Sequence, residues 1–213
     1  GGMDFLDEVN YFSRRADIPN YWIGGNHEWW DEWIRVVRTA PKDHNHFRHI
    51  RSHILLAPRI HSWVWAKKNF SAAAGAVSID RQWRTEGKSW WPQEQLTDEE
   101  VNGAMEKFRR NRPDYLITHD CSNYTPWNSR LKPDADSQEH RRKIDNILRA
   151  CAPKMHFHGH MHERYEWENV CSAPNELIQT IGLECDGDEN NWGILDTETD
   201  EFKWRGVEPA RFA

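Results

Sequence analysis

Apolar and polar residues alternate along the chain with two different periods, one helical and one extended. Phe5, Leu6, Val9 and Phe12 fall on one helical face and predict a helix over residues 3–14. The capping-box pattern that starts at Thr97 predicts a second helix, which extends to residue 110. Further helices are predicted over residues 29–37 and 137–151, and short apolar runs predict strands at residues 21–23, 54–57, 61–66, 70–77, 115–118, 154–158, 176–181, 192–195 and 202–204.

The order of these elements is strand, polar loop and helix, repeated, with extra strands between the repeats. This order predicts an α/β or α+β fold in which a β-sandwich is flanked by helices. Since no internal repeat or linker interrupts the pattern, we expect residues 1–213 to form a single domain. Two long polar stretches, residues 41–53 and 78–95, are predicted as loops. Loops that follow the carboxyl ends of strands usually carry the chemistry of α/β folds.

Composition narrows the possible function classes. The chain has 213 residues, of which 38% are hydrophobic and 29% are charged, and its net charge is −6. These values are typical of a globular protein and disfavour a generic duplex-DNA binder, which is usually basic. No apolar run approaches the roughly 20 residues that span a bilayer, so we expect no membrane contact. The spacing of the cysteines favours a cytoplasmic protein. The cysteines form no C-x-x-C pair and are expected to be reduced thiols: Cys121, Cys151, Cys171 and Cys185.

Three predicted strands end abruptly in residues that can bind metal ions. The first strand runs into Asn26 and His27, the second into His119, and the third into His160 and His162. Histidine nitrogen and asparagine oxygen suit borderline cations such as Mn²⁺, Fe or Zn²⁺. Ligands at strand ends are held rigidly, as a catalytic metal site requires.

These segments also match motifs of a known family in their chain order. The sequence has G-N-H-E at residues 25–28, a lone strand-end histidine at residue 119, and G-H-M-H at residues 159–162. In this combination the chain resembles the calcineurin-like metallophosphoesterase superfamily. Residues 75–94, together with residues 119–121, are similar to the phage and actinobacterial branch of that superfamily. The resemblance therefore implies a protein of a bacterial or phage-infected cell.

The resemblance implies a role for each matching residue. Asn26, His119 and His160 would bind one divalent metal ion and His162 would bind another, so an intact site would hold two. Mn²⁺ is the expected ion, with Fe and Zn²⁺ as alternatives. A hydroxide held by the ions would attack phosphorus, and His27 would stabilise the phosphate or protonate the leaving oxygen.

Arg81 and Arg84 are candidates for binding the substrate. A planar guanidinium group can donate two hydrogen bonds to phosphate oxygens. The alternative for each arginine is a surface ion pair with Asp80 or Glu86.

The first two motifs of the superfamily, D-x-H and G-D-x-x-D, are absent from the sequence. In the family they supply further ligands of the first metal ion and the carboxylate that bridges both ions. Only 25 residues precede Asn26, which leaves no room for the family's opening strand. Asp4 or Asp7 could replace the bridging carboxylate only from a predicted helix. Gly1 and Gly2, which precede Met3, are consistent with a cloning remnant.

Three explanations of the missing motifs stay open. The reading frame is truncated or starts late, or a separate chain supplies the N-terminal strand, or the protein is a degenerate relative that binds one metal ion or none. The first two explanations predict an exposed sheet edge, which favours pairing with another chain or self-association.

Two function hypotheses follow. The first is a metal-dependent phosphoesterase that hydrolyses a phosphomonoester or phosphodiester, with nucleotides and nucleic acids among its candidate substrates. The second is a catalytically inactive binding module that keeps the fold. The pair Asn26 and His27 favours the enzyme, and the missing bridging carboxylate favours the binding module. A structural zinc protein is less favoured, because closed zinc sites use two local pairs of Cys or His ligands and the chain offers one.

Overall fold

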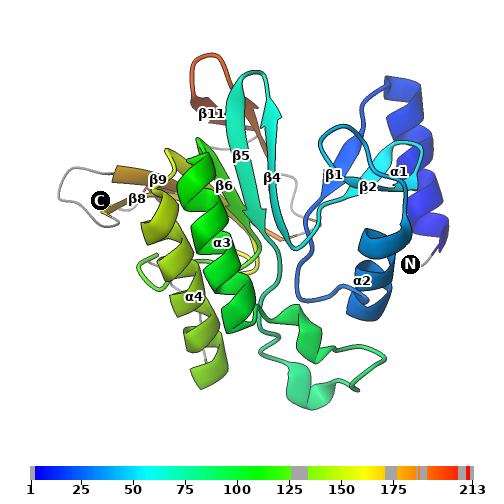
Figure 1. Cartoon of the computed structure of the whole chain (residues 1–213), viewed down its shortest axis with the longest axis horizontal. Coiled ribbons are helices and arrows are strands. Elements are labelled where there is room, and N and C mark those ends of the chain that lie inside the picture. The colour runs from blue at the N-terminus through cyan, green and yellow to red at the C-terminus, as the bar shows by residue number, and fades with distance from the viewer. Residues whose placement is uncertain are drawn as a thin grey trace.

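The chain folds around a seven-stranded sheet that has helices on one face and further strands on the other (Figure 1). The computed structural model describes residues 3–125, 134–170, 177–185, 187, 191–205 and 210–211. Gly1, Gly2 and Cys171 lie outside these residues. The mixed α/β class and the sandwich flanked by helices, both predicted from the sequence, are confirmed.

The large sheet carries its strands in the order β12-β8-β9-β7-β6-β5-β4. Strands β5, β6, β7 and β9 run parallel, while β4 and β8 pair antiparallel with β5 and β9. Because parallel strands point their carboxyl ends to the same edge, the loops after β6 and β7 are neighbours. The bounds are β4 (Ile60–Trp65), β5 (Lys68–Ala73), β6 (Tyr115–Thr118), β7 (Met155–His158), β8 (Tyr165–Val170), β9 (Leu177–Gly182) and β12 (Ala210–Arg211).

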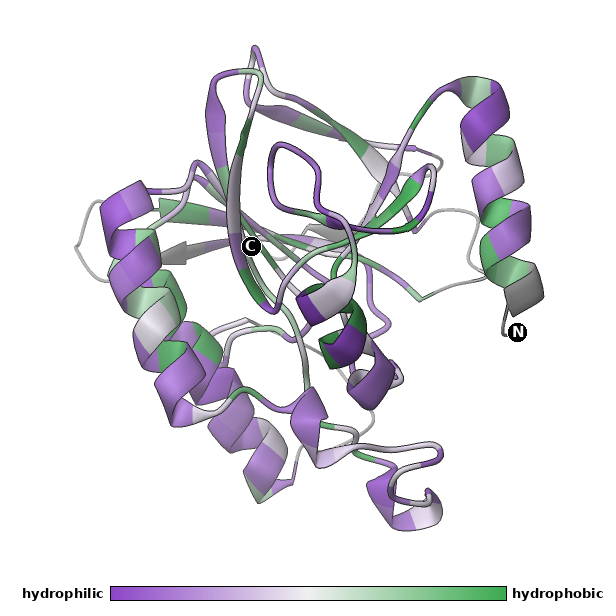
Figure 2. Ribbon diagram, turned by 45° about the vertical axis from the view of Figure 1, so that its right-hand side comes forward, coloured by the Kyte–Doolittle hydropathy of each residue, from purple (hydrophilic) through white to green (hydrophobic). Residues whose placement is uncertain are grey.

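Helices α3 (Asp98–Asn111) and α4 (Ala135–Cys151) cover one face of this sheet (Figure 1). The predicted capping box of α3 is confirmed, because Thr97 Oγ1 accepts from the Glu100 amide at 3.2 Å and the Glu100 carboxylate accepts from the Thr97 amide at 2.9 Å. Hydrophobic green segments interrupt the purple, hydrophilic turns of these helices in Figure 2. The apolar faces of α3 and α4 pack against the sheet in a buried hydrophobic cluster. Its members are Ala73, Leu96, Val101, Ala104, Phe108, Leu116, Ile144, Ile147, Leu148 and Ile178.

A small sheet and a hairpin cover the other face. The small sheet has the order β1-β3-β2, in which β1 (Asn20–Trp22) is parallel to β3 (Ile54–Leu56) and β2 (Arg48–Arg51) is antiparallel to it. The hairpin consists of β10 (Gly193–Asp196) and β11 (Glu201–Trp204). An aromatic core lies between these elements and the large sheet; its buried members are Phe47, Leu55, Ala57, Trp63, Phe70, Ala72, Tyr115, Met155, Phe157 and Ile181.

Helices α1 (Met3–Ala16) and α2 (Trp30–Thr39) pack against the small sheet, as the helical periodicity predicts (Figure 1). The Trp30 side chain at the start of α2 is fully buried, and the Arg59 guanidinium lies 3.9 Å from the centre of its ring. This stacking fixes the loop that joins β1 to α2, in which the first of the candidate ligands lies.

Three parts of the sequence-based prediction need correction. Residues 41–53 are not wholly loop, since Arg48–Arg51 form β2; the polar sequence R-H-I-R hides this strand. Strands β8 and β12 are missing from the prediction, although Tyr165 and Trp167 alternate with glutamates in β8. Strand β5 ends at Ala73, earlier than predicted, because Gly75 takes a φ of 111° and turns the chain out of the sheet.

The aromatic core contains a buried histidine whose titration should affect stability. His61 is 4% exposed, and its ring stacks on Trp63 at 5.4 Å and meets the edge of Phe47 at 4.5 Å. Burial, followed by the charge of Lys107, lowers the pKa of His61 to about 4. An unfolded chain binds this proton near the usual histidine pKa of about 6.5. Protonation therefore favours the unfolded state as the pH falls between these two values.

We predict that the free energy of unfolding falls as the pH is lowered from about 6.5 to 4, with His61 contributing on the order of 2 kcal/mol of the loss. The substitution His61→Phe keeps a ring in the core and should remove that part of the loss. Urea unfolding at pH 7 and pH 4 measures the difference, and exposed His44, replaced by Gln, is the control. Equal losses in the wild type and in His61→Phe would contradict the prediction.

Candidate active site

Three loops meet at the carboxyl edge of the sheets, each following one strand. Residues 23–28 follow β1, His119 follows β6, and residues 159–162 follow β7. The Gly159 amide donates to the His119 carbonyl at 3.1 Å, which ties the second loop to the third. The Gly75 amide donates to the Gly24 carbonyl at 2.9 Å, which ties the first loop to the end of β5.

The closest contact at this edge joins Asn26 to His119. Their side-chain atoms Oδ1 and Nε2 lie 3.0 Å apart, a spacing at which both can bind one cation or form a hydrogen bond. The His160 ring lies 5.2 Å from the His119 ring, centre to centre. Burial and the neighbouring His160 lower the pKa of His119 to about 3, so its imidazole stays neutral, as a metal ligand must.

A buried chain of hydrogen bonds orients the Asn26 side chain. Its Nδ2 donates to Ser78 Oγ at 3.0 Å, and Ser78 Oγ donates to the Glu94 carboxylate at 2.8 Å. Glu94 also accepts from the Ser78 amide at 2.5 Å and is 0% exposed. Because Nδ2 is held by Ser78, Oδ1 is left to face His119. The periodicity of the sequence does not reveal this chain of hydrogen bonds. Ser78 and Glu94 do lie in the stretch that resembles the phage and actinobacterial branch.

Gly25 is the point of closest approach between the first two loops. A Cβ atom at this position would lie 2.8 Å from Cε1 of His119, closer than real side chains approach. At Gly159, which flanks the same ring, a Cβ atom would lie at an ordinary 3.9 Å. The Glu28 carboxylate accepts a hydrogen bond from the Gly25 amide at 3.3 Å. This contact stabilises the loop and does not involve the candidate ligand histidines.

His160 and His162 belong to a tight turn after β7. Their φ angles are 64° and 51°, in the left-handed region that side chains rarely adopt, and the Met161 amide donates to the Gly159 carbonyl at 2.7 Å. His160 is half-buried and His162 is exposed. Backbone strain at two candidate ligands of the same turn is typical of functional sites.

The two candidate arginines have different neighbours. Nη2 of Arg84 lies 3.0 Å from both ring nitrogens of His27 and 2.7 Å from the Asp80 carboxylate. The Arg81 guanidinium instead pairs with Asp136 at 2.5 Å and with Asp134 at 3.3 Å, near the start of α4. Arg84 thus makes the ion pair with Asp80 that the sequence suggested, and it also contacts His27, which the sequence did not suggest. Arg81 has partners that the sequence did not suggest.

A buried contact between Asp120, the residue after His119, and His140 is not evident from the sequence. His140 Nδ1 and an Asp120 carboxylate oxygen are 2.8 Å apart, and the two side chains are 2% and 1% exposed. Burial alone would raise the pKa of Asp120, but the hydrogen bond with His140 and the charges of His160 and Arg141 lower it to about 2. Packing of α4 against the sheet brings His140 to this position. The spacing of Asp120 and His140 in the sequence therefore could not predict their contact.

The donor set does not complete the metal site that the resemblance implies. Asn26 and the three histidines supply nitrogen and amide-oxygen donors, yet no three His, Cys, Asp or Glu side chains in the described ranges are grouped so that they could hold an ion. The nearby carboxylates have other partners: Asp120 pairs with His140, and Glu184 accepts from the Cys185 amide at 3.0 Å. Asp7, on α1, pairs with Arg51 at 2.6 Å. A bridging carboxylate is therefore missing from the part of the chain that the structure describes.

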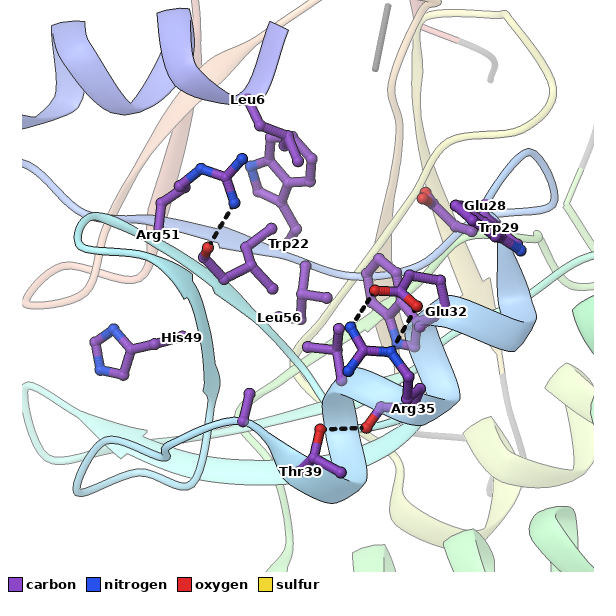
Figure 3. A pocket seen from close by; sticks show the side chains of 14 residues that line it. Leu6, Trp22, Glu28, Trp29, Glu32, Arg35, Thr39, His49, Arg51 and Leu56 are labelled. Atoms are coloured by element: carbon purple, nitrogen blue, oxygen red, sulfur yellow. Dashed lines mark hydrogen bonds and ion pairs between the residues drawn. The ribbon is translucent and has the colours of Figure 1, made fainter. Parts of the chain in front are cut away.

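A separate cavity of about 610 Å³ lies beside this site, between α1, α2 and the small sheet (Figure 3). Leu6, Trp22 and Leu56 form much of its apolar lining. Its arginines already have partners, because Arg35 pairs with Glu32 and Arg51 donates to the Ile50 carbonyl at 2.8 Å. None of the candidate ligand histidines lines this cavity, so it is not the proposed reaction site.

Comparison with known proteins yields one family match. A model of the calcineurin-like phosphoesterase family matches residues 3–164, a range that contains all the strand-end motifs described above. The search of curated proteins finds no match. Across the described segments, no helix is both long and apolar enough to cross a membrane.

The close approach at Gly25 leads to a prediction. Gly25→Ala should push the His119 ring away from Asn26 or displace the loop, and should lower the free energy of unfolding by about 1–3 kcal/mol. Gly159→Ala places a methyl group at an ordinary contact distance from the same ring, so it serves as the matched control. Urea unfolding and the NMR signals of the His119 ring check both variants. Indistinguishable effects of the two substitutions would rule out the steric argument.

Proposed function

The chain belongs to the calcineurin-like phosphoesterase family, whose members are metal-dependent hydrolases of phosphate esters, and we propose that it acts on a phosphomonoester or phosphodiester at the Asn26–His119 centre. The main support is the 3.0 Å approach of Asn26 Oδ1 to His119 Nε2, with His27 on the same loop as Asn26. Mn²⁺ is the proposed ion, because neutral histidine and amide ligands suit borderline cations, and Fe and Zn²⁺ are alternatives. Nucleotides and nucleic acids belong to the proposed substrate class.

His27 is the residue proposed to handle a proton. His27 is exposed, and it directly follows the candidate ligand Asn26 in the chain. In hydrolysis it would donate a proton to the leaving alkoxide oxygen as the bond from phosphorus to that oxygen breaks. Arg84 lies against the same ring and can donate to the non-bridging phosphate oxygens, while Asp80 holds its guanidinium in place.

A second candidate function is a catalytically inactive module that binds phosphate. The incomplete donor set favours it for the chain alone, because no three His, Cys, Asp or Glu side chains within the described ranges are grouped so that they could hold a metal ion. Such a module needs Arg84 for binding but gains nothing from a proton donor at His27. The two functions therefore differ in how they respond to loss of His27.

We predict that Mn²⁺-dependent turnover of a chromogenic phosphodiester falls about 100-fold or more in His27→Ala and in His160→Ala. The first variant loses the proton donor and the second a metal ligand. Arg110→Gln, which alters an exposed ion pair on α3, is the control. Turnover that survives both histidine substitutions would overturn the enzymatic proposal, and phosphate binding without turnover in the wild type would favour the binding module.

The two arginines give a further prediction. Arg84→Gln should reduce kcat/KM about 10-fold or more, because it removes a charged donor beside His27. Arg81→Gln should have a smaller effect, since the Arg81 guanidinium pairs with two aspartates near α4. Steady-state kinetics with the same diester measure kcat/KM for both variants. A larger loss of kcat/KM in Arg81→Gln than in Arg84→Gln would contradict the assignment of Arg84 as the substrate-binding arginine.

A further inference from the structure

The cavity between α1, α2 and the small sheet has no part in the proposed reaction. It measures about 610 Å³, and none of the candidate ligand histidines lines it (Figure 3). Cavities of roughly 300–1,000 Å³ that are mostly apolar and carry a few polar groups are typical sites for small molecules. The size and lining of this cavity therefore make it a candidate for a second, separate binding site.

Three tryptophans contribute to the wall of the cavity: Trp22 on β1, Trp29 just before α2, and Trp33 on α2. Trp29 is 62% exposed, whereas most tryptophans in folded proteins are largely buried. It occupies the N-cap position of α2, where small polar residues are preferred, and its side chain makes no capping hydrogen bond. Neither core packing nor helix capping accounts for an indole at this position.

Both arginines that line the cavity are paired with carboxylates. Arg35 Nε donates to the Glu32 carboxylate at 2.7 Å, and Arg51 Nε donates to the Asp7 carboxylate at 2.6 Å. An anionic ligand would have to compete with these carboxylates for the guanidinium groups. The positive charges of the lining therefore do not favour an anion.

Glu28, which also lines the cavity, has no cationic partner among the described residues. Its Oε1 atom accepts from the Gly25 amide at 3.3 Å. The side chain is half-buried, and a carboxylate in such a place is costly without a counter-charge. The one histidine of the lining, His49, lies at the opposite end of the cavity from Glu28 (Figure 3). A positive group that enters beside Glu28 would supply the missing counter-charge.

A second polar group of the lining also has no partner. Trp33 is 6% exposed, and its indole N–H is a buried donor without an acceptor in the part of the chain that the structure describes. A buried donor that is left without an acceptor costs free energy. A ligand atom that accepts this hydrogen bond would remove the cost.

We infer that this cavity binds a small organic cation, whose ammonium group pairs with the Glu28 carboxylate and whose planar body packs against the indoles of Trp22 and Trp29. Indole faces attract organic cations, so the aromatic wall and the carboxylate act in the same direction. An acceptor atom on the planar body receives the Trp33 N–H. The inference does not depend on the proposed function, because none of these residues takes part in the reaction.

The ligand would also act on the candidate active site, through Glu28. The Glu28 carboxylate holds the Gly25 amide, and Gly25 is where the His119 ring comes closest to the first loop. A cation that fixes the Glu28 side chain therefore changes the freedom of the loop that carries Asn26. Because coupling between two sites is reciprocal, events at His119 would also change the affinity of the cavity.

The test uses three probes that share a phenol ring and differ in charge. Tyramine carries an ammonium group at neutral pH, para-ethylphenol is uncharged, and desaminotyrosine carries a carboxylate. Calorimetric titration of the full chain, without metal or substrate, measures the dissociation constant of each probe. We expect tyramine to bind below about 1 mM and about ten-fold or more tightly than para-ethylphenol, with desaminotyrosine the weakest.

Variants of the lining locate the binding. Glu28→Gln keeps an oxygen acceptor for the Gly25 amide and removes the charge, so it should weaken tyramine binding about ten-fold or more without changing the affinity for para-ethylphenol. Trp29→Ala removes an exposed indole and should weaken tyramine binding about five-fold. Glu99→Gln and Trp192→Ala change exposed residues that do not line the cavity and are the matched controls. Circular dichroism identifies the variants that remain folded.

Four outcomes would overturn the binding site or its occupant. Equal affinity for tyramine and para-ethylphenol would indicate an uncharged ligand, and tightest binding of desaminotyrosine would indicate an anion. Tyramine binding that is unchanged in folded Glu28→Gln would exclude the proposed counter-charge. A chain that sediments as a dimer, and as a monomer after Trp29→Ala, would indicate that a second copy covers the cavity.

The link to the candidate active site has its own measurement. The NMR signals of the His119 ring should shift when tyramine saturates the wild type, and they should shift less in Glu28→Gln at equal saturation. Signals that stay in place at saturation overturn the link. Neither measurement involves turnover, so failure of the proposed function is detected separately, by the kinetics of the His27 and His160 variants.

Discussion

The approach of His119 to Asn26 is possible because residue 25 has no side chain. A methyl group there would occupy the space of the imidazole, so the loops after β1 and β6 could not come together at their present distance. The two loops belong to different sheets, and this is where the layers of the sandwich touch at the ligand edge. The rest of the site follows from the contact, since His160 is brought in by the parallel pairing of β6 with β7. A local steric condition at one glycine thus determines whether strand-end residues from separate sheets act together.

Once the loops are in contact, buried polar groups hold the side chains in one orientation. Glu94 is completely buried, and burial raises the pKa of its carboxyl group while the hydrogen bonds from Ser78 oppose that shift. A carboxylate in such a place is costly unless it is satisfied, and two donors from one residue satisfy it. The carboxylate of Asp120, the residue after His119, is likewise buried and contacts His140. Both arrangements limit the freedom of a ligand by fixing its neighbour, which favours a site that is organised before substrate arrives.

The sequence predicted those parts of the molecule that depend on local order. The capping box at Thr97, the strands that precede Asn26, His119 and His160, and the amphipathic helices are all encoded within a few residues. The partners of the ligands are not local: Ser78 and Glu94 reach Asn26 from a long loop, and His140 reaches Asp120 from α4. Nor could a single sequence reveal that Ile117, on β6, is only partly buried, because the run of apolar residues around it is the same whether or not another layer covers the strand. The strands that the prediction missed have polar or charged faces, which obscure the period of two.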